Sequence, residues 1–135
     1  MATTLMIRDE TTGGETLHEL AVELLTERIT IRELIRSRVF QEVKDYNRKK
    51  PGFFRGLIQP TDAEQALNGY KVGRKKHIDW QKQFDAAVAA FKGNGVIILV
   101  DDKQATDLEE EITVMPETQV SFLKLVPLVG GVKTF

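Results

Sequence analysis

Two adjacent glycines, Gly130 and Gly131, lie close to the end of the printed chain and have the residue type and position for a specific chemistry. Glycine has no Cβ, so an extended tail ending in glycine passes through a narrow channel and leaves its carboxyl carbon unhindered. A terminal glycine carboxylate is therefore suited to activation by ATP as an acyl adenylate. The segment Val132–Phe135 follows the pair, and Gly131 cannot be adenylated until that segment is removed.

Other chemistries find little support in the residue types. The chain has no cysteine, which excludes disulfides, thiolate metal sites and a cysteine nucleophile. His18 and His77 are far apart, and neither has a second histidine at the i+4 spacing typical of helix-borne zinc sites. No nucleophile, base and oxyanion site can be assembled from the motifs, so we predict a protein that is not an enzyme and needs no cofactor or metal.

A basic segment runs from Lys44 to Lys82. It contains ten Lys/Arg and four Asp/Glu, a net charge of +6, whereas the whole chain has a net charge of −1. The segment could contact nucleic acid or an acidic partner, with Phe53, Phe54 and Tyr70 nearby for stacking. The near-zero charge of the whole chain favours solvated loops or lysines that accept conjugation, so we do not expect a nucleic-acid partner.

Acidic residues occur at Asp101-Asp102 and Glu109–Glu111. They lack the alternating ligand spacing of a calcium loop. We therefore interpret them as a polar turn and a solvated segment.

The last apolar segment before the glycines predicts a strand from Gln119 to about Val126. Alternation in a strand places Val120, Phe122 and Lys124 on one side, with Phe122 as the core residue. The opposite side then forms an exposed apolar patch near the tail, suited to binding a partner protein. The residues of this predicted patch are Leu123, Leu125, Pro127 and Leu128. Alternatively, Trp80 or Phe84 covers the patch.

The N-terminal third predicts a strand, a turn and a capped helix. Thr3–Arg8 is a strand candidate and Asp9–Gly14 a turn. Leu17–Leu25 is ambiguous, and its local pattern slightly favours a helix. Thr30 and Glu33 have capping-box spacing at the start of a helix that ends before Pro51. Its core stripe is predicted to contain Ile31, Leu34, Ile35, Val39, Val43 and Tyr46.

The rest of the chain predicts a long connection followed by strands. Within residues 47–79, the capping-box pattern Thr61–Glu64 predicts one short helix. Asp79 is expected to cap a second helix, which ends at Gly93–Gly95. Its apolar stripe is predicted to be Trp80, Phe84, Val88 and Phe91. Val96–Val100 is the clearest strand, and Ile112–Met115 with a turn at Pro116–Thr118 precedes the last strand.

The size and composition indicate one domain with a real core, because 41% of the 135 residues are hydrophobic. No apolar run approaches 18 residues, and no basic stretch followed by an apolar segment occurs at the N-terminus. We therefore expect neither a membrane span nor a signal peptide, and a cytoplasmic location.

The order of these elements resembles ubiquitin-like β-grasp proteins. The C-terminal pattern of VIILV, an acidic segment, Pro116–Thr118 and QVSFLKLVPLVGG is especially similar to the molybdopterin-synthase small subunit and related sulfur carriers. The resemblance covers roughly residues 3–46 and 95–131. It implies an α+β fold, a mixed sheet packed on one main helix, and it favours a strand for Leu17–Leu25. A largely helical insertion at about 47–94 departs from the usual pattern, giving a single domain over residues 1–131.

The same resemblance implies a function and partners. Elaborated proteins of this kind occur among bacterial ubiquitin-like modifiers encoded beside activating-enzyme, conjugating-enzyme and JAB-type metallopeptidase genes. A peptidase is then expected to cut between Gly131 and Val132, and an ATP-dependent enzyme to activate Gly131 for conjugation to amines of target proteins. Two alternatives stay open: a sulfur carrier with a C-terminal thiocarboxylate, and a non-covalent binding module that uses the basic insertion.

Overall fold

The computed structural model describes residues 3–49, 53–60, 63–66, 69–72 and 77–125, apart from the side chains of residues 49 and 64–66. The chain begins with a hairpin of β1 (Thr3–Glu10) and β2 (Thr16–Leu24), followed by β3 (Arg28–Thr30) and α1 (Ile31–Lys49). Three short strands come next: β4 (Phe53–Phe54), β5 (Glu64–Ala66) and β6 (Gly69–Lys71). The C-terminal half contains α2 (Trp80–Lys92), β7 (Val96–Val100), β8 (Lys103–Ala105), β9 (Glu111–Thr113) and β10 (Gln119–Lys124).

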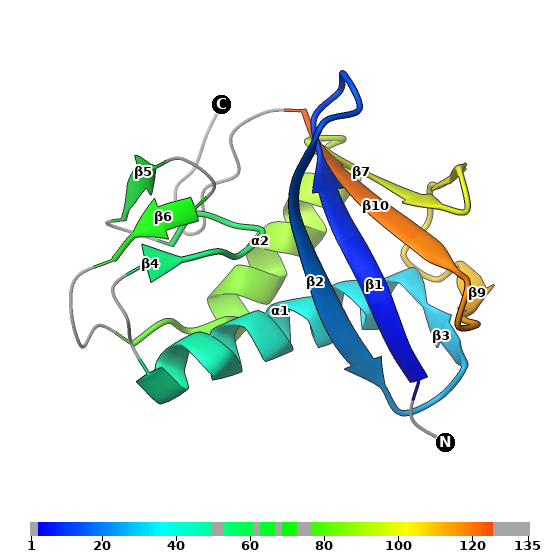
Figure 1. The fold of residues 1–135 in the computed structure, drawn as a ribbon, viewed down its shortest axis with the longest axis horizontal. Helices are drawn as coiled ribbons and strands as arrows, with labels where there is room; N and C mark the ends of the chain where they lie inside the picture. Colours follow the sequence, from blue (N-terminus) through cyan, green and yellow to red (C-terminus); the bar gives the residue numbers. More distant parts are fainter. Residues whose placement is uncertain (1–2, 50–52, 61–62, 67–68, 73–76, 126–135) are drawn as a thin grey trace.

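The main sheet has five strands in the order β2-β1-β10-β7-β8. The first strand and the last, β1 and β10, pair in parallel near its centre, and the other pairs are antiparallel. In Figure 1, α1 passes behind β2, β1 and β10, so it covers one face of this sheet. The described residues therefore form an α+β fold with a mixed sheet and two helices.

The core forms where alternate residues of the sheet meet the apolar stripe of α1. Ile7, Val22, Ile98 and Phe122 are fully buried on the sheet side. Thr30 and Glu33 form the predicted capping box, with each side chain bonded to the other residue's backbone N–H. All six residues of the predicted stripe are buried: Ile31, Leu34, Ile35, Val39, Val43 and Tyr46.

The local pattern of the second segment was misleading, because residues 16–24 form β2 and not a helix. Pairing with β1 over its whole length decides this, as the order implied by the resemblance had indicated. The turn prediction at Asp9 was also wrong. β1 continues to Glu10, Asp9 is buried, and the turn lies at residues 11–14.

The insertion is not largely helical, although it contains α2. Where a short helix was predicted after Thr61, residues 64–66 form β5, paired with β6 in a three-stranded sheet β4-β6-β5. Thr61 and Asp62 lie outside the described residues. The amide of Ala63 bonds to the carbonyl of Pro60, and the Gln59 side chain bonds to the carbonyl of Ala63, so local turn contacts replace the expected cap.

Asp79 caps α2 as predicted, and the helix ends at Gly93, followed by Asn94 with a φ of 60°. The buried face of α2 differs from the predicted stripe. Only Phe91 of that stripe is buried, together with Gln83 and Ala87, while Trp80, Phe84 and Val88 are half-buried. The reason is that α2 packs along α1, where the Trp80 ring meets Phe40 edge-on at 5.4 Å between centroids.

Candidate functional site

The residues predicted to take part in the acyl chemistry follow Leu125, the last described residue, in the sequence. Gly130, Gly131 and Val132 are outside the described residues, and so are Pro127 and Leu128 of the predicted binding patch. What the structure shows is the base from which the tail leaves, at the end of β10 (Lys124) and Leu125.

This base is held firmly in the sheet. β10 lies between β1 and β7, and its Phe122 side chain is fully buried, as predicted. Beyond the strand, the amide of Leu125 donates to the carbonyl of Gly95 at 2.9 Å. The direction in which the chain leaves the domain is therefore fixed up to Leu125.

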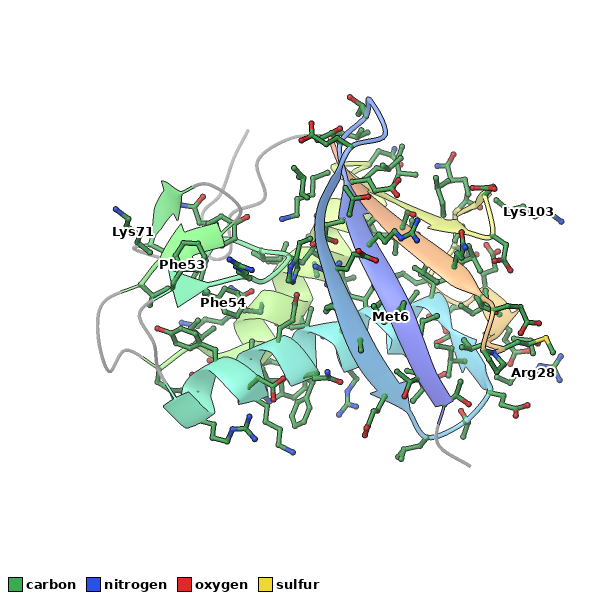
Figure 2. The ribbon with its side chains drawn as sticks, viewed as in Figure 1. Met6, Arg28, Phe53, Phe54, Lys71 and Lys103 are labelled. Carbon is green, nitrogen blue, oxygen red and sulfur yellow. The ribbon has the colours of Figure 1, made fainter. Side chains whose placement is uncertain are left out.

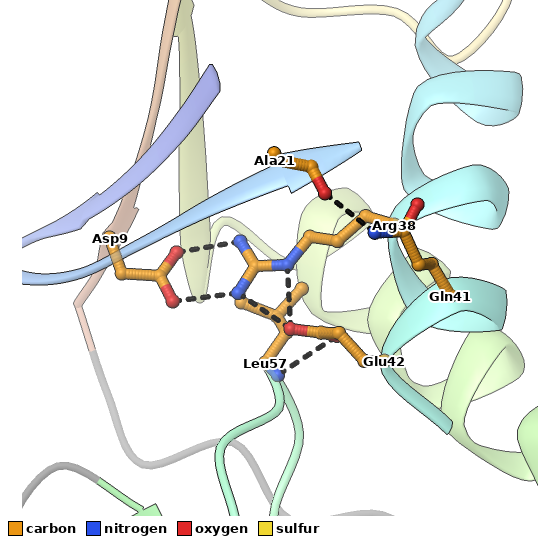
Figure 3. A network of polar contacts seen from close by, with 6 residues as sticks. All are labelled: Asp9, Ala21, Arg38, Gln41, Glu42 and Leu57. Atoms are coloured by element: carbon orange, nitrogen blue, oxygen red, sulfur yellow. Dashed lines mark hydrogen bonds and ion pairs between the residues drawn. The ribbon is translucent and has the colours of Figure 1, made fainter. Parts of the chain in front are cut away.

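A buried ion network lies under the same end of β10. The Arg38 side chain on α1 has no exposed surface, and its two terminal nitrogens donate to the two carboxylate oxygens of Asp9 at 2.6 Å each. Its Nε and Nη2 also donate to Oε2 of Glu42, at 3.2 and 3.1 Å (Figure 3). The guanidinium lies 4.6 Å from the centroid of the Phe122 ring. One cation therefore ties α1 to β1 and supports the core residue of β10.

Asp9 and Glu42 share the Arg38 guanidinium, and their pKa values shift in opposite directions. Burial alone would raise the pKa of Asp9, but the charge and the paired hydrogen bonds of Arg38 overcome burial and lower the pKa. Burial raises the pKa of Glu42, and the nearby Asp9 charge adds to it, while Arg38 opposes it only in part. The pKa of Arg38 is raised: burial would lower it, but the Glu42 and Asp9 charges outweigh burial.

Lys124 continues the buried side of β10 without breaking the alternation, because its side chain faces the insertion. Its Nζ lies 5.7 Å from the centroid of the Tyr70 ring on β6. Burial lowers the pKa of Lys124, and the Asp9 charge partly compensates for burial. Lys124 therefore contacts Tyr70 of the small β4-β6-β5 sheet instead of packing in the apolar core.

The opposite side of β10 carries the two described residues of the predicted exposed patch, and only Leu125 of the two is exposed. Leu123 is half-buried, Leu125 is 40% exposed, and the register sets Leu123 opposite Ile97 and Ser121 opposite Leu99. Ile97 and Leu99 on β7 are half-buried as well. We call Ile97, Leu99, Leu123 and Leu125 the outer strip. Trp80 and Phe84 both pack against the buried core, and the Trp80 ring also meets Phe40 on α1, so the alternative that one of them covers this strip is wrong.

The described part of the basic segment offers few rings for stacking on bases. Phe54 and Tyr70 are buried, and the Arg55 guanidinium already lies over the half-buried Phe53 ring at 5.7 Å. Figure 2 shows Phe53 and Phe54 beside the small sheet, on the side of the molecule away from Met6 and Arg28. Residues 73–76, which include three of the basic side chains, are outside the described residues.

The acidic segments have structural roles. Asp101 and Asp102 adopt positive φ in the turn between β7 and β8, and the Asp101 carboxylate accepts from the amide of Gln119 at 2.9 Å. Glu109 pairs with Arg32 at 2.8 Å. Across the described ranges, no group of three His, Asp or Glu side chains is placed to hold a metal ion. Neither described helix has the length and apolar character needed to cross a bilayer.

The sequence prediction missed Arg38 and Asp9, although a signal for Arg38 exists. Position 38 lies three and four residues from Ile35 and Leu34, inside the apolar stripe, where a charged residue is expected only with a buried partner. Asp9 gave no such signal because aspartate before a Gly-rich segment is typical of a turn.

Comparisons with protein-family models, with curated proteins and with solved structures found no significant match to this chain.

Proposed function

We propose that this protein is a ubiquitin-like modifier of the β-grasp type, activated at Gly131 and conjugated to amines of target proteins. The observation that carries the proposal is the arrangement of the main sheet, in which an N-terminal hairpin is followed by the main helix and the last strand lies parallel to the first. This is the order of elements that the resemblance implies. It supports a β-grasp fold whose last strand leads directly to the diglycine.

The position of the glycines relative to the domain suits an acyl donor. Gly131 is the sixth residue after Leu125, and six fully extended residues span at most about 20 Å. A tail of that length reaches into the ATP channel of a second protein while the buried end of β10 stays in the sheet. A JAB-type metallopeptidase would first remove Val132–Phe135, and activating and conjugating enzymes of the cytoplasm would then carry the acyl group.

The outer strip supports the same proposal, because it provides an apolar contact surface at the base of the tail. An activating enzyme that binds Leu123 and Leu125 would hold the tail close to its nucleotide. The predicted patch residues Pro127 and Leu128 extend this surface in the sequence.

The test is the intact mass of the protein recovered from its native cells. A species that ends at Gly131, either free or attached to another protein, supports the modifier. A species in which sulfur replaces one carboxylate oxygen supports the sulfur carrier. Recovery of only the full-length chain, with the partner genes expressed, rejects both and favours the non-covalent binding module.

Two glycine variants make this test specific. Gly131→Phe should abolish all adducts, because a bulky side chain blocks the channel and hinders the acyl carbon. Gly13→Phe is the matched control in the exposed β1–β2 turn, where an added Cβ meets nothing closer than 3.7 Å. Adducts that persist in Gly131→Phe would reject the assignment of the acyl group.

A further inference from the structure

A pocket of about 420 Å³ lies between β2, α1 and β4, and no residue of the outer strip is among its lining residues. β2 forms an edge of the main sheet, and within the lining Gln41 of α1 donates to the carbonyl of Ala21 on that edge. The polar lining of the pocket includes Glu42, Asp45 and Tyr46 of α1, and its apolar lining includes Leu20, Phe53 and Phe54.

One lining residue, Tyr46, carries a buried polar group with no partner among the described residues. Tyr46 is 5% exposed, and its hydroxyl has no hydrogen bond to any part of the chain that the structure describes. Buried polar side chains are normally hydrogen-bonded, since an unmet hydroxyl loses its contacts with water and gains none. The Tyr46 hydroxyl is thus available to a ligand.

Glu42 supplies a second oxygen with spare capacity beside Tyr46. The two residues are four apart on α1 and so are neighbours on one helix face. Oε2 of Glu42 accepts from Arg38, whereas Oε1 accepts, within the described ranges, only a long bond of 3.4 Å from the amide of Leu57. A carboxylate has about four acceptor positions, so Oε1 can accept a further hydrogen bond.

Among the lining residues, two carboxylates (Glu42 and Asp45) outnumber one guanidinium (Arg55). Asp45, with a side chain 57% exposed, adds a second carboxylate on the lining, and Arg48 lies 4.0 Å from it. The Arg38 guanidinium is occupied by Asp9 and Glu42. Burial lowers the pKa of His18, which keeps this ring neutral at neutral pH. The remaining basic side chain of the lining, Arg55, lies over Phe53.

The walls are apolar. Leu20, Phe53 and Phe54 line the pocket, and Phe54 meets the Tyr46 ring edge-on at 5.6 Å between centroids. Such walls suit a hydrocarbon stem that leads to a polar end group, as in a pocket with a few convergent polar atoms.

We propose that this pocket binds an ammonium group carried on an aliphatic stem, as in a lysine side chain or a simple alkylamine. The ammonium would donate to the Tyr46 hydroxyl oxygen and to Oε1 of Glu42, and Asp45 would add charge attraction. The stem would lie against Leu20 and the two phenylalanines. This site is independent of the diglycine and of the proposed modification.

The test is an NMR titration of the full chain, following the backbone amides of Leu20, Ala21, Gln41 and Arg55. Nα-acetyl-lysine methylamide should shift these signals saturably, with a millimolar Kd. The norleucine analogue, which keeps the stem and lacks the ammonium, should bind at least about tenfold more weakly. Butylammonium distinguishes a simple alkylamine ligand from a lysine side chain. If butylammonium and the lysine derivative bind equally, the ammonium and its stem account for the affinity. If only the lysine derivative binds, the ligand is a polypeptide.

Variants of the pocket complete the test. Tyr46→Phe keeps the ring and should weaken lysine binding about three- to tenfold, the loss expected for one hydrogen bond. Asp45→Asn should also weaken binding, whereas the matched control Asp102→Asn, in the exposed β7–β8 turn, should leave it unchanged.

Three results would overturn the proposal. They are saturable shifts outside the pocket only, equal binding of the norleucine analogue, and no saturable shift with either the lysine derivative or butylammonium. Retention of the amide spectrum in each unbound variant verifies that a loss of binding is not a loss of fold.

Discussion

Arg38 is the residue on which the interior of this molecule depends most directly. It lies at the centre of a network that joins β1 through Asp9, its own helix through Glu42, and the chain after β4 through the amide of Leu57 (Figure 3). Buried ion pairs add little net stability compared with apolar residues, but an unpaired buried charge is costly. Arg38 therefore needs both buried carboxylates, Asp9 on β1 and Glu42 on its own helix, as partners.

Replacing Arg38 by methionine should lower the free energy of unfolding by about 3–5 kcal/mol, because it leaves Asp9 and Glu42 buried without their cation. Urea denaturation at pH 7 measures this loss. Arg32→Met is the matched control on the same helix. Its pair with Glu109 is exposed, so it should cost at most about 1 kcal/mol. Equal losses in the two variants would contradict the special role of Arg38.

The raised pKa of Glu42 predicts a pH dependence of stability. Burial raises this pKa in the folded state, so between its unfolded value near 4.5 and the higher folded value the native protein binds more protons than the unfolded chain. The stability contributed by this group therefore increases as the pH falls towards 4.5. Relative to Glu42→Gln, the wild type should gain up to about 1.4 kcal/mol for each unit by which the pKa is raised.

Denaturant midpoints of both proteins between pH 8 and 4.5 measure this difference. A difference that stays constant, or that shrinks as the pH falls, would contradict the assignment of a raised pKa to Glu42. Asp9 does not interfere in this range, because its lowered pKa places its loss of stabilisation below pH 3.8.

Tyr46→Phe should leave the unliganded protein as stable as the wild type, or more stable by about 1 kcal/mol, because the hydroxyl it removes is buried with no partner among the described residues. Thermal unfolding measures the change. Val43→Ala, one turn earlier on the same helix, removes buried apolar atoms and should be clearly destabilising. A loss above about 1 kcal/mol in Tyr46→Phe would show that the hydroxyl has a structural partner.

At the scale of elements, the two helices begin at the caps that their sequences contain. The Asp79 carboxylate accepts from the amides of Gln81 and Lys82 at 2.9 and 3.3 Å. Which residues of each apolar stripe are buried depends, by contrast, on the element that the helix packs against. α1 covers the sheet and buries its whole stripe, whereas α2 packs beside α1 and buries only part of its own.

Asp79→Ala should destabilise the protein by about 1 kcal/mol, because two amides at the start of α2 lose their acceptor. Asp79→Asn keeps an acceptor oxygen and should cost much less. Chemical denaturation of the two variants measures the difference. Equal effects would mean that the negative charge near the helix start matters more than the hydrogen bonds.

The edge strand β2 is protected by a side chain of α1. Gln41 donates to the carbonyl of Ala21 at 2.6 Å and accepts from the amide of Glu23 at 3.2 Å. These bonds occupy two backbone groups that would otherwise be free to pair with another chain. Ala21 and Gln41 both line the pocket described above, so this protection extends into the lining.

At the scale of the whole molecule, the tail base and the outer strip lie at one end of the main sheet. Leu123 pairs in register with Glu10 at the end of β1, while Leu24 pairs with Thr3 at the opposite end. Leu25, which is 85% exposed, follows Leu24. Two exposed leucines thus mark opposite ends of the sheet, and of these two Leu125 is the one next to the tail.

Leu125→Asp should reduce the fraction of the protein found in adducts in its native cells about tenfold or more, because a charge replaces an apolar contact with the activating enzyme. Its stability should change by no more than about 0.5 kcal/mol, since the side chain is 40% exposed. Leu25→Asp is the matched control and should leave adduct formation unchanged. Equal loss in both variants would exclude a docking role for the outer strip.

The sequence alone predicted the parts of the fold that depend on local rules. The α1 stripe, the Thr30 and Asp79 caps, and the strands β7 and β10 follow from periodicity and capping chemistry, which act over a few residues. The buried position of Phe122 was predicted for the same reason. For Leu17–Leu25 local rules slightly favoured a helix, and only the order of elements implied by the resemblance indicated β2.

Tertiary structure decided what depends on contacts between distant residues. The pairing of Arg38 with Asp9 joins residues 29 apart in sequence, and the short strands of the insertion exist only through pairing with one another. The pocket likewise needs β2, α1 and β4 together. No local pattern encodes such contacts, because the free energy that selects them arises from burial and pairing in the assembled fold.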